Sequence, residues 1–434
     1  MDATVDIGRR LVQMFWDPEP TNDIVRDQPV WCLGSSYKLN NSPSSSPRQE
    51  PSPAPEPPAK DSIQAPARLP ATPPDSTSSS LDSSLAYDEA PLDGGWPPAF
   101  LDDFESRIWM TYRSEFDPIA KSQDPKALSA LSFSMRLKSQ LSDQNGFASD
   151  SGWGCMIRSG QSLLANAMLV HRLGRGWRRG MESLEEKKIL SLFADDPRAP
   201  YSIHNFVRHG ASACGKYPGE WFGPSATARC IQALTNEKEP ALRVYSTGDG
   251  PDVYEDSLMK IANPDGTAFH PTVILVGTRL GIDKITPVYW EALAASLQMP
   301  QSIGIAGGRP SSSHYFIGVQ GLHFFYLDPH FTRPALPYHE DLDEFTQEEV
   351  DTCHTRKLRR LHIKEMDPSM LIGFLIRDEE DWKDWRRSVK HVQGKAIIHV
   401  SDHDPTAHLH ELGGSIDEVE TLSDNDDDET ALGD

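Results

Sequence analysis

The chain has few cysteines and no closely spaced pair of them. Its 434 residues include five, which are Cys32, Cys155, Cys214, Cys230 and Cys353, and no two form a C-x-x-C motif. An odd, scattered set of this kind indicates neither a disulfide framework nor a zinc ribbon. We therefore expect a reducing compartment in which the thiols stay free.

Long apolar runs and an excess of positive charge are also missing. Apolar runs such as Val273 to Val276 are far too short to span a bilayer, and no charged-then-apolar signal is visible near the start. Asp and Glu number 64 against 42 Lys and Arg, a formal net charge of -22. Nucleic acid and anionic membrane surfaces bind clustered Lys and Arg, so neither is expected as the primary partner. The sequence predicts a cytoplasmic protein that acts on a protein or peptide.

Two stretches lack the composition of a folded core. From Asn41 to about Ala86 the chain is rich in Ser, Pro and Ala and has no aromatic residue, and residues 411–434 hold ten acids and no Lys or Arg. Such segments bury too little apolar surface to offset the entropy of ordering. We predict one globular domain made of residues 1–40 and 91–394, interrupted by a disordered insert at 41–90 and followed by a disordered acidic tail at 395–434.

Elsewhere the apolar pattern predicts a mixture of helices and strands, hence an α/β (α+β) fold. After Pro97 and Pro98, four apolar residues recur at helical spacing, namely Phe100, Phe104, Ile108 and Tyr112. Pro224 suits the first turn of a later helix, on whose apolar side Cys230 is a core residue. The other expected elements are a short helix at 7–15, a loop at 197–218, a buried strand at 272–276, a helix at 289–299, a Gly-rich loop at 304–309, and a strand and an acidic helix within 361–390.

Cys155 directly follows Gly152-Trp153-Gly154 and opens a helical pattern that runs from Met156 to Met168. At a helix N-terminus, unpaired N–H groups and the helix dipole favour the thiolate, whose pKa falls to roughly 3.5 to 7.5 from about 8.5. The same N–H groups can hold an oxyanion. Cys155 is therefore the candidate nucleophile, and the alternative is that it is one more small packing residue.

Two histidines compete for the role of general base. His314 begins the first strand of a predicted hairpin, and His330 follows the second strand, two residues after Asp328. With a turn at Gln320-Gly321, His314 faces Leu327 across the hairpin. Because side chains alternate along a strand, Asp328 and His330 share a face and His314 points to the other. The spacing favours His330 as a base held by Asp328, while a plain turn at Asp328 and a base at His314 stay open.

The remaining motifs do not predict a metal or phosphate site. Gly307-Gly308-Arg309-Pro310 lacks the Lys-Ser/Thr of a phosphate loop, so it indicates a mobile loop beside the site. The C-terminal histidines lack the fixed spacing of a metal site. Trp221, before Phe222-Gly223-Pro224, reads on its own as an anchor for its helix.

Four motifs together resemble the signatures of the autophagins, the autophagy-related cysteine proteases, in a fungal-type member. They are Gly152 to Arg158, Gly307 to Pro310 with His314 to Gly318, Tyr326 to His330, and Met366 to Ser369. Pro29 to Gly34 and Trp109 to Arg113 also resemble the N-terminal part of that family. The motifs occur in the family's order and the resemblance covers most of residues 25–390, departing at the insert and at both ends.

The resemblance implies a papain-like fold in a single catalytic domain. It implies that Cys155 attacks, that His330 is the general base and that Asp328 orients it. Tyr112 matches the tyrosine that the family places beside the oxyanion site. Trp221 matches the tryptophan that covers the cysteine. The loop from Gly307 to Ser312 matches the one that moves aside for substrate.

The implied activity is a thiol protease of autophagy, and so a hydrolase linked to protein transport. It would cut the ubiquitin-like modifier of autophagy after a glycine near its C-terminus and deconjugate the modifier from phosphatidylethanolamine. The implied partners are the soluble precursor and the lipid-linked form, with transient membrane contact through the modifier, no nucleic acid, and neither a metal nor an organic cofactor. The implied location is the cytoplasm, with recruitment to the pre-autophagosomal structure and the nucleus as a further compartment.

Two rival hypotheses remain. The first is a catalytically idle adaptor that only binds the modifier, which would not need Cys155, Asp328 and His330 together. The second is another papain-like deubiquitinase, which the family contexts of Trp153 and Trp221 disfavour. The sequence does not decide between the precursor and the lipid-linked form as preferred substrate, nor does it reveal redox control or docking residues in the tails.

Overall fold

The structure is a computed structural model that describes residues 19–24, 27–39, 93–141, 146–309 and 312–405. The predicted helix at 7–15, the whole insert at 41–90 and residues 406–434 of the predicted tail lie outside the described residues. The strands are β1 Val30–Cys32, β2 Ser35–Tyr37, β3 Arg113–Ala120, β4 Gly146–Ser149, β5 Arg243–Ser246, β6 Asp252–Tyr254, β7 Thr272–Arg279, β8 Ser302–Arg309, β9 Ser312–Gln320, β10 His323–Leu327, β11 Arg333–Pro334, β12 Arg360–His362, β13 Ser369–Ile376 and β14 His399–Ser401.

The helices are α2 Pro98–Glu105, α3 Ala127–Ala130, α4 Phe133–Leu141, α5 Cys155–Leu173, α6 Ser183–Ser191, α7 Ile203–Ala213, α8 Pro224–Lys238, α9 Glu255–Ala262, α10 Trp290–Gln298, α11 Gln347–Asp351 and α12 Glu379–Lys390. Short 3-10 turns are η1 Pro287–Tyr289, η2 Leu342–Glu344 and η3 Ile363–Glu365. The mixture confirms the predicted α/β (α+β) class. Within the described residues, no helix combines the length and apolar character needed to cross a membrane.

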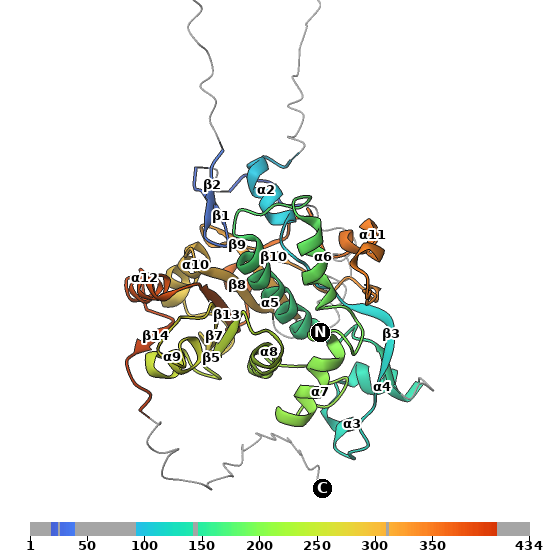
Figure 1. Cartoon of the computed structure of the whole chain (residues 1–434). Helices are drawn as coiled ribbons and strands as arrows, with labels where there is room; N and C mark the ends of the chain where they lie inside the picture. Colours follow the sequence, from blue (N-terminus) through green and yellow to red (C-terminus); the bar gives the residue numbers. More distant parts are fainter. Residues whose placement is uncertain (1–18, 25–26, 40–92, 142–145, 310–311, 406–434) are drawn as a thin grey trace, which may run out of the picture.

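A nine-stranded sheet forms the centre of the molecule (Figure 1). Its main path is β12-β10-β9-β8-β13-β7-β5. Off this path, β1 pairs with both β9 and β2. Strands β7 and β13 are apolar along almost their whole length because helices cover both faces of the sheet. Helices α5 and α8 contribute to the apolar core on one face, and α10 and α12 to the core on the other.

The N-terminal strands belong to this sheet although residues 38–97 separate them from α2. Strand β1 pairs with β9 through Trp31 and Val319. The guanidinium of Arg175, after α5, donates to the carbonyl oxygen of Leu33 over 2.8 Å and pairs with the buried carboxylate of Asp103 in α2. The two chain segments that flank the insert are thus tied to the same arginine.

Four elements differ from those expected. The helix after Pro98 ends at Glu105, because Asn166 of α5 hydrogen-bonds both the N–H and the C=O of Ile108 and holds that segment extended. Residues 304–309, expected as a loop, lie in strand β8 between β9 and β13. The stretch at 197–218 contains helix α7, whose first turn is capped by the Ser202 hydroxyl. Structure also continues past residue 394, where β14 pairs with β6.

Candidate active site

Cys155 is the first residue of α5, as predicted from the sequence, and its side chain is 2% exposed. The chain reaches it through two glycines that other residues could not replace. Gly152 has a φ of +95°, and a Cβ on Gly154 would lie 2.4 Å from Oδ2 of Asp150. The N–H of Cys155 has no partner within the helix, because the first four N–H groups of a helix lack one. The thiol therefore sits at the positive end of a 19-residue helix.

A buried ion network that sequence reasoning missed fixes the approach to Cys155. Asp150 accepts hydrogen bonds from the N–H of Arg113 over 2.6 Å and from Nε of Arg158 over 2.7 Å. The Nη1 of Arg158 lies 2.8 Å from Oδ1 of Asp195, and all these side chains are almost fully buried. The main-chain carbonyl of Asp150 accepts from the N–H of Gly154. The only sequence signal was an arginine within the helical pattern that follows Cys155.

His330 lies beside the thiol and is held by Asp328. Its Nδ1 is 2.5 Å from Oδ1 of Asp328, and its Nε2 lies 3.2 Å from Oγ of Ser312, with the Cys155 thiol close enough to shift its pKa. Burial alone would lower the pKa of His330, but the contacts with Asp328 and Cys155 outweigh it and raise the pKa to about 9. Burial would likewise raise the pKa of Cys155, yet the hydrogen bond and positive charge of His330 bring it below the ordinary value. The geometry favours a thiolate–imidazolium pair at neutral pH.

The predicted hairpin register and the placement of His314 were wrong. The turn lies at Gly321-Leu322, since Gln320 pairs with His323, and a bulge between Phe325 and Tyr326 shifts the register again. His314 consequently does not point away. Its Nε2 is 3.8 Å from the Asp328 carboxylate, on the same side as His330.

His314 nevertheless differs electrostatically from His330. It is 4% exposed, and burial lowers its pKa to about 4. Its Nδ1 lies 3.1 Å from the carbonyl oxygen of Ser312, which fixes the ring. A neutral imidazole results, 5.2 Å between ring centroids from that of His330. His330 is thus the histidine with both the thiol contact and the raised pKa.

Tyr112 and the residues beside it come from a separate segment. The ring of Tyr112 lies edge-on to that of His330 at 5.3 Å between ring centroids, and its hydroxyl lies near the Cys155 thiol and the backbone of Gly152. Burial, followed by the proximity of the Cys155 thiolate, raises the pKa of Tyr112, which therefore remains a donor. Trp109 in the same segment donates from Nε1 to the carbonyl oxygen of Asp328 over 2.8 Å, an orienting contact that the sequence did not reveal.

Trp221 and the β8–β9 hairpin enclose the thiol from the other direction. Trp221 lies close enough to Cys155 to help lower the pKa of the thiol, and it is 41% exposed, so it lies at the surface near the thiol rather than in the core. A cavity of about 40 Å³ lies between Trp221, the hairpin and the start of β13. Its lining includes Met156, Gly308 and Ser312. The small cavity thus adjoins the first turn of α5, next to Cys155.

One group of described side chains has the spacing of a metal site, and it coincides with the catalytic candidates. The ligand atoms of His314, Asp328 and His330 all lie within 4.8 Å of one another. Both histidines already direct Nδ1 to an oxygen, His330 to Asp328 and His314 to the Ser312 carbonyl. A larger hollow of about 820 Å³ lies between β1, α10 and the end of α12 and shares no lining residue with this site.

A cysteine at the start of a central helix, beside an Asp–His pair that directly follows a strand of the central sheet, defines a papain-like cysteine protease. The sequence of residues 97–388 matches the model of a protein family described as "Peptidase C54 catalytic domain". The chain belongs to this peptidase family, the ATG4 cysteine proteases of autophagy, which confirms the fungal-type resemblance and the papain-like fold.

Curated fungal relatives match this chain along nearly their whole lengths. "Probable cysteine protease atg4" of Sclerotinia sclerotiorum is 68% identical, covering 98% of this chain and 99% of the relative. "Cysteine protease ATG4" of Gibberella zeae is 64% identical, with 98% of each chain covered. "Cysteine protease 1" of Neurospora crassa is 61% identical, covering 98% of this chain and 92% of the relative.

Proposed function

We propose that this cysteine protease cleaves the ubiquitin-like modifier of autophagy after a glycine near its C-terminus and also releases the modifier from phosphatidylethanolamine. The observation that carries the proposal is the Asp328–His330 pair beside Cys155 at the start of α5. A cavity of only about 40 Å³, lined by Trp221, Met156 and Gly308, adjoins the first turn of this helix. So small a space favours a residue without a side chain at the cleavage point.

The far end of this cavity offers a contact for the folded body of the modifier. The N–H of Asp367 donates to the carbonyl of Gly308, and the N–H of Leu280 donates to that of Pro368. Ile282, two residues further on, is 80% exposed. We propose Ile282 as a contact for the folded body of the modifier. The modifier would lie over Ile282 with its tail running past Gly308 to Cys155.

In the proposed reaction, the Cys155 thiolate attacks the carbonyl of the glycine. The N–H of Cys155 and the hydroxyl of Tyr112 stabilise the oxyanion, and His330, oriented by Asp328, protonates the departing amine. Water then hydrolyses the thioester, with His330 as the base. The precursor and the lipid-linked modifier both carry an amide after this glycine, so one set of residues serves both. We propose the cytoplasm and the pre-autophagosomal structure as the places of action.

The test is incubation of the protein with precursor modifier, followed by mass measurement of the product, and with lipid-linked modifier on vesicles, followed by measurement of the released modifier. We expect a product that ends in glycine from both substrates, and no product from the Cys155→Ser variant. Tight binding of the modifier without cleavage would instead identify an adaptor. Cleavage of ubiquitin conjugates in preference would identify a deubiquitinase.

A further inference from the structure

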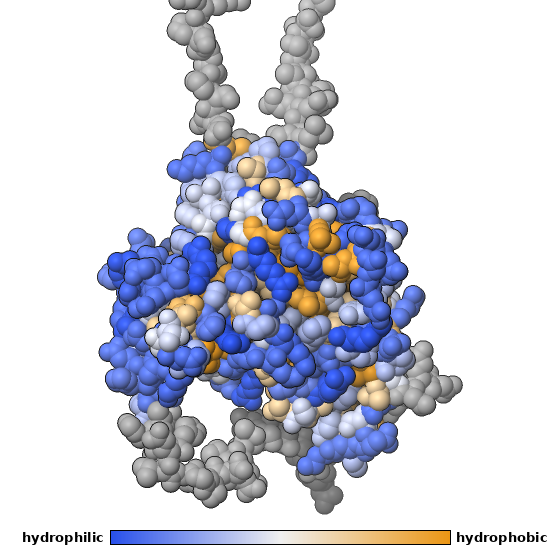
Figure 2. Space-filling view, viewed as in Figure 1, coloured by the Kyte–Doolittle hydropathy of each residue, from blue (hydrophilic) through white to orange (hydrophobic). Residues whose placement is uncertain are grey.

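Helices α3 and α4, near the Gly152 turn that precedes Cys155, expose apolar side chains that have no role in the proposed reaction. Leu128 is 44%, Phe133 81% and Leu137 49% exposed. Phe133 and Leu137 lie four residues apart and so share one face of α4. Figure 2 shows apolar colour reaching the surface in the area of α4. We call these three residues the α4 face.

Helix α4, which carries two residues of the α4 face, packs beside the turn that leads into Cys155. Met135, in the middle of α4, is 3% exposed and packs on Gly152, where a Cβ would lie 3.6 Å from its sulfur. Met135 therefore places α4 beside the glycine turn that leads into Cys155, the first residue of α5.

We assign this side to the leaving group, because α4 packs on the Gly152 turn that leads directly into Cys155. In the lipid-linked substrate of the proposed function, the group that leaves is the amine of a lipid in a bilayer. The acyl chains of that lipid stay in the apolar interior of the bilayer, so the enzyme has to meet the bilayer surface close to Cys155.

The charge around the α4 face differs from that of the chain as a whole. The chain carries a net charge of -22, whereas residues 121–141 contain four Lys or Arg and one Asp, a net charge of +3. Lys126 and Arg136 are exposed there. Arg136 donates from Nε to the carbonyl oxygen of Leu131, which holds its guanidinium at the junction of α3 and α4. The one acid, Asp124, accepts a hydrogen bond from the hydroxyl of Tyr217.

We propose that the α4 face is a membrane contact that seats the enzyme on the bilayer holding its lipid-linked substrate. Exposed Phe and Leu side chains insert at the headgroup boundary, and neighbouring cations attract lipid phosphates. This inference rests on the proposed deconjugation for its purpose, but the contact itself does not need the modifier. A docking site for the modifier's body is the competing occupant, and the test separates the two.

The first measurement uses the full-length Cys155→Ser protein and vesicles of phosphatidylethanolamine, phosphatidylcholine and phosphatidylinositol without any modifier. We expect the protein to float with the vesicles, and the further changes Phe133→Ser and Leu137→Ser to weaken this binding about tenfold, since two partly buried apolar side chains are lost. The matched control changes Met181 and Leu184 near α6, which are 52% and 51% exposed, to serine. It should float like its parent. Equal flotation of all three proteins overturns the proposal.

The second measurement compares two substrates of the active enzyme. Phe133→Ser with Leu137→Ser should slow release of the modifier from vesicles about tenfold and leave cleavage of the soluble precursor unchanged. An equal loss on both substrates would place the modifier's body, not the membrane, on the α4 face and overturn the proposal. If the unaltered enzyme cleaves the precursor but releases no lipid-linked modifier, the proposed deconjugation fails, and flotation alone decides the membrane contact.

Discussion

Cys155 and Cys230 lie on two helices that pack against each other, α5 and α8, and both side chains are at most 2% exposed. Their surroundings nevertheless move their pKa values in opposite directions. Burial raises the pKa of Cys230, and the neighbouring thiol of Cys214 raises it further. Cys155 is buried as well, but the imidazole of His330 brings its pKa below the ordinary value.

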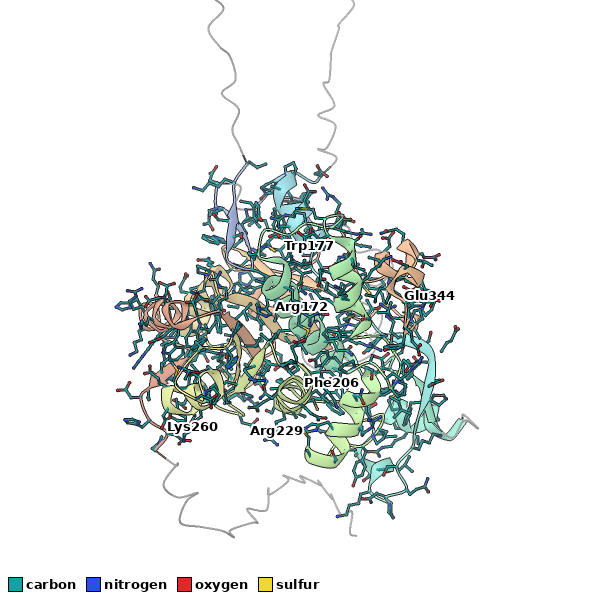
Figure 3. All side chains as sticks on the ribbon, in the orientation of Figure 1. Arg172, Trp177, Phe206, Arg229, Lys260 and Glu344 are labelled. Atoms are coloured by element: carbon teal, nitrogen blue, oxygen red, sulfur yellow. The ribbon has the colours of Figure 1, made fainter. Side chains whose placement is uncertain are left out.

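The comparison shows that burial does not make a nucleophile. Cys230 packs in the core with its sulfur 3.6 Å from the carbonyl oxygen of Phe206. Figure 3 marks this region by the labels of Phe206 on α7 and Arg229 on α8. Cys155 differs in that a charged partner reaches it from another part of the chain, 175 residues away in sequence. The local sequence thus places Cys155 at the start of a helix, and the tertiary structure makes it reactive by bringing His330 beside it.

The largest expected effect is the loss of cleavage when Cys155 is replaced and Cys230 is used as the control. Cys155→Ser should fold and bind the modifier but lose cleavage by roughly 10⁴-fold or more, because an alcohol is a far weaker nucleophile and triad members act as a unit. The same change at Cys230 should leave turnover within about twofold, since its sulfur is remote from the reaction. Cleavage of precursor modifier by the two variants is the measurement. Comparable losses at the two positions would contradict the assignment of the nucleophile.

The next effect concerns the partner that distinguishes the two cysteines. His330→Ala should lower turnover at least roughly a hundredfold, the low end for loss of a general base. His314→Ala should cost less, because its imidazole is buried and neutral and contacts Asp328 only at 3.8 Å. Single-turnover rates at saturating substrate measure both. A larger loss for His314→Ala would show that the two histidines have been assigned in the wrong order.

Local signals were sufficient for the helix starts. The glycines before Cys155 and the proline at the start of α8 predicted both helices correctly. The helix after Pro98 was predicted too long, because its apolar spacing continues to Tyr112 while Asn166, from a distant helix, binds the backbone at Ile108. A pattern cannot reveal that such a competing partner exists.

The candidate site was predictable as a list of residues but not as an arrangement. A strict count along the hairpin placed His314 on the wrong face, since it contained neither the Gly321-Leu322 turn nor the bulge at Tyr326. The network of Asp150, Arg158 and Asp195 was invisible for a similar reason, because Asp195 lies 37 residues after Arg158. Contacts between distant segments decide which of the listed groups meet.

A smaller effect tests how the surroundings of Cys155 select substrates. Changing the glycine at the cleavage site of the modifier to alanine should slow cleavage about five- to 150-fold, since overpacking a closed slot costs typically 1 to 3 kcal/mol. Trp221→Ala should widen the slot and reduce this ratio, even if overall activity falls. Both substrates are measured with both enzymes. A glycine preference that survives Trp221→Ala undiminished would mean that the selectivity arises elsewhere.

The pH dependence of alkylation and proteolysis tests the shifted pKa values of Cys155 and His330. The lowered pKa of Cys155 keeps its thiolate populated as pH falls below the range in which an ordinary thiol ionises. The raised pKa of His330 keeps the imidazolium until pH rises through about 9. Alkylation of Cys155 by iodoacetamide should therefore stay fast at neutral pH, and proteolysis should decline above about pH 9. In His330→Ala the alkylation profile should move to higher pH, toward that of a cysteine peptide used as the control. An unchanged profile would mean that the helix dipole alone sets the pKa of Cys155.

The smallest effect belongs to Cys230, whose only predicted role is to fill space. Cys230→Ala removes one buried sulfur and its 3.6 Å contact with the Phe206 carbonyl, so it should destabilise the fold by about 1 to 2 kcal/mol. Because the raised pKa keeps this thiol neutral, no charge is lost and the cost should not depend on pH between 6 and 8. Denaturant midpoints at both pH values, with cleavage of the precursor measured beside them, provide the check. A cost that grows as pH rises, or a loss of activity beyond that explained by unfolding, would show that the thiol of Cys230 ionises in the folded protein and that the two cysteines differ less than their surroundings indicate.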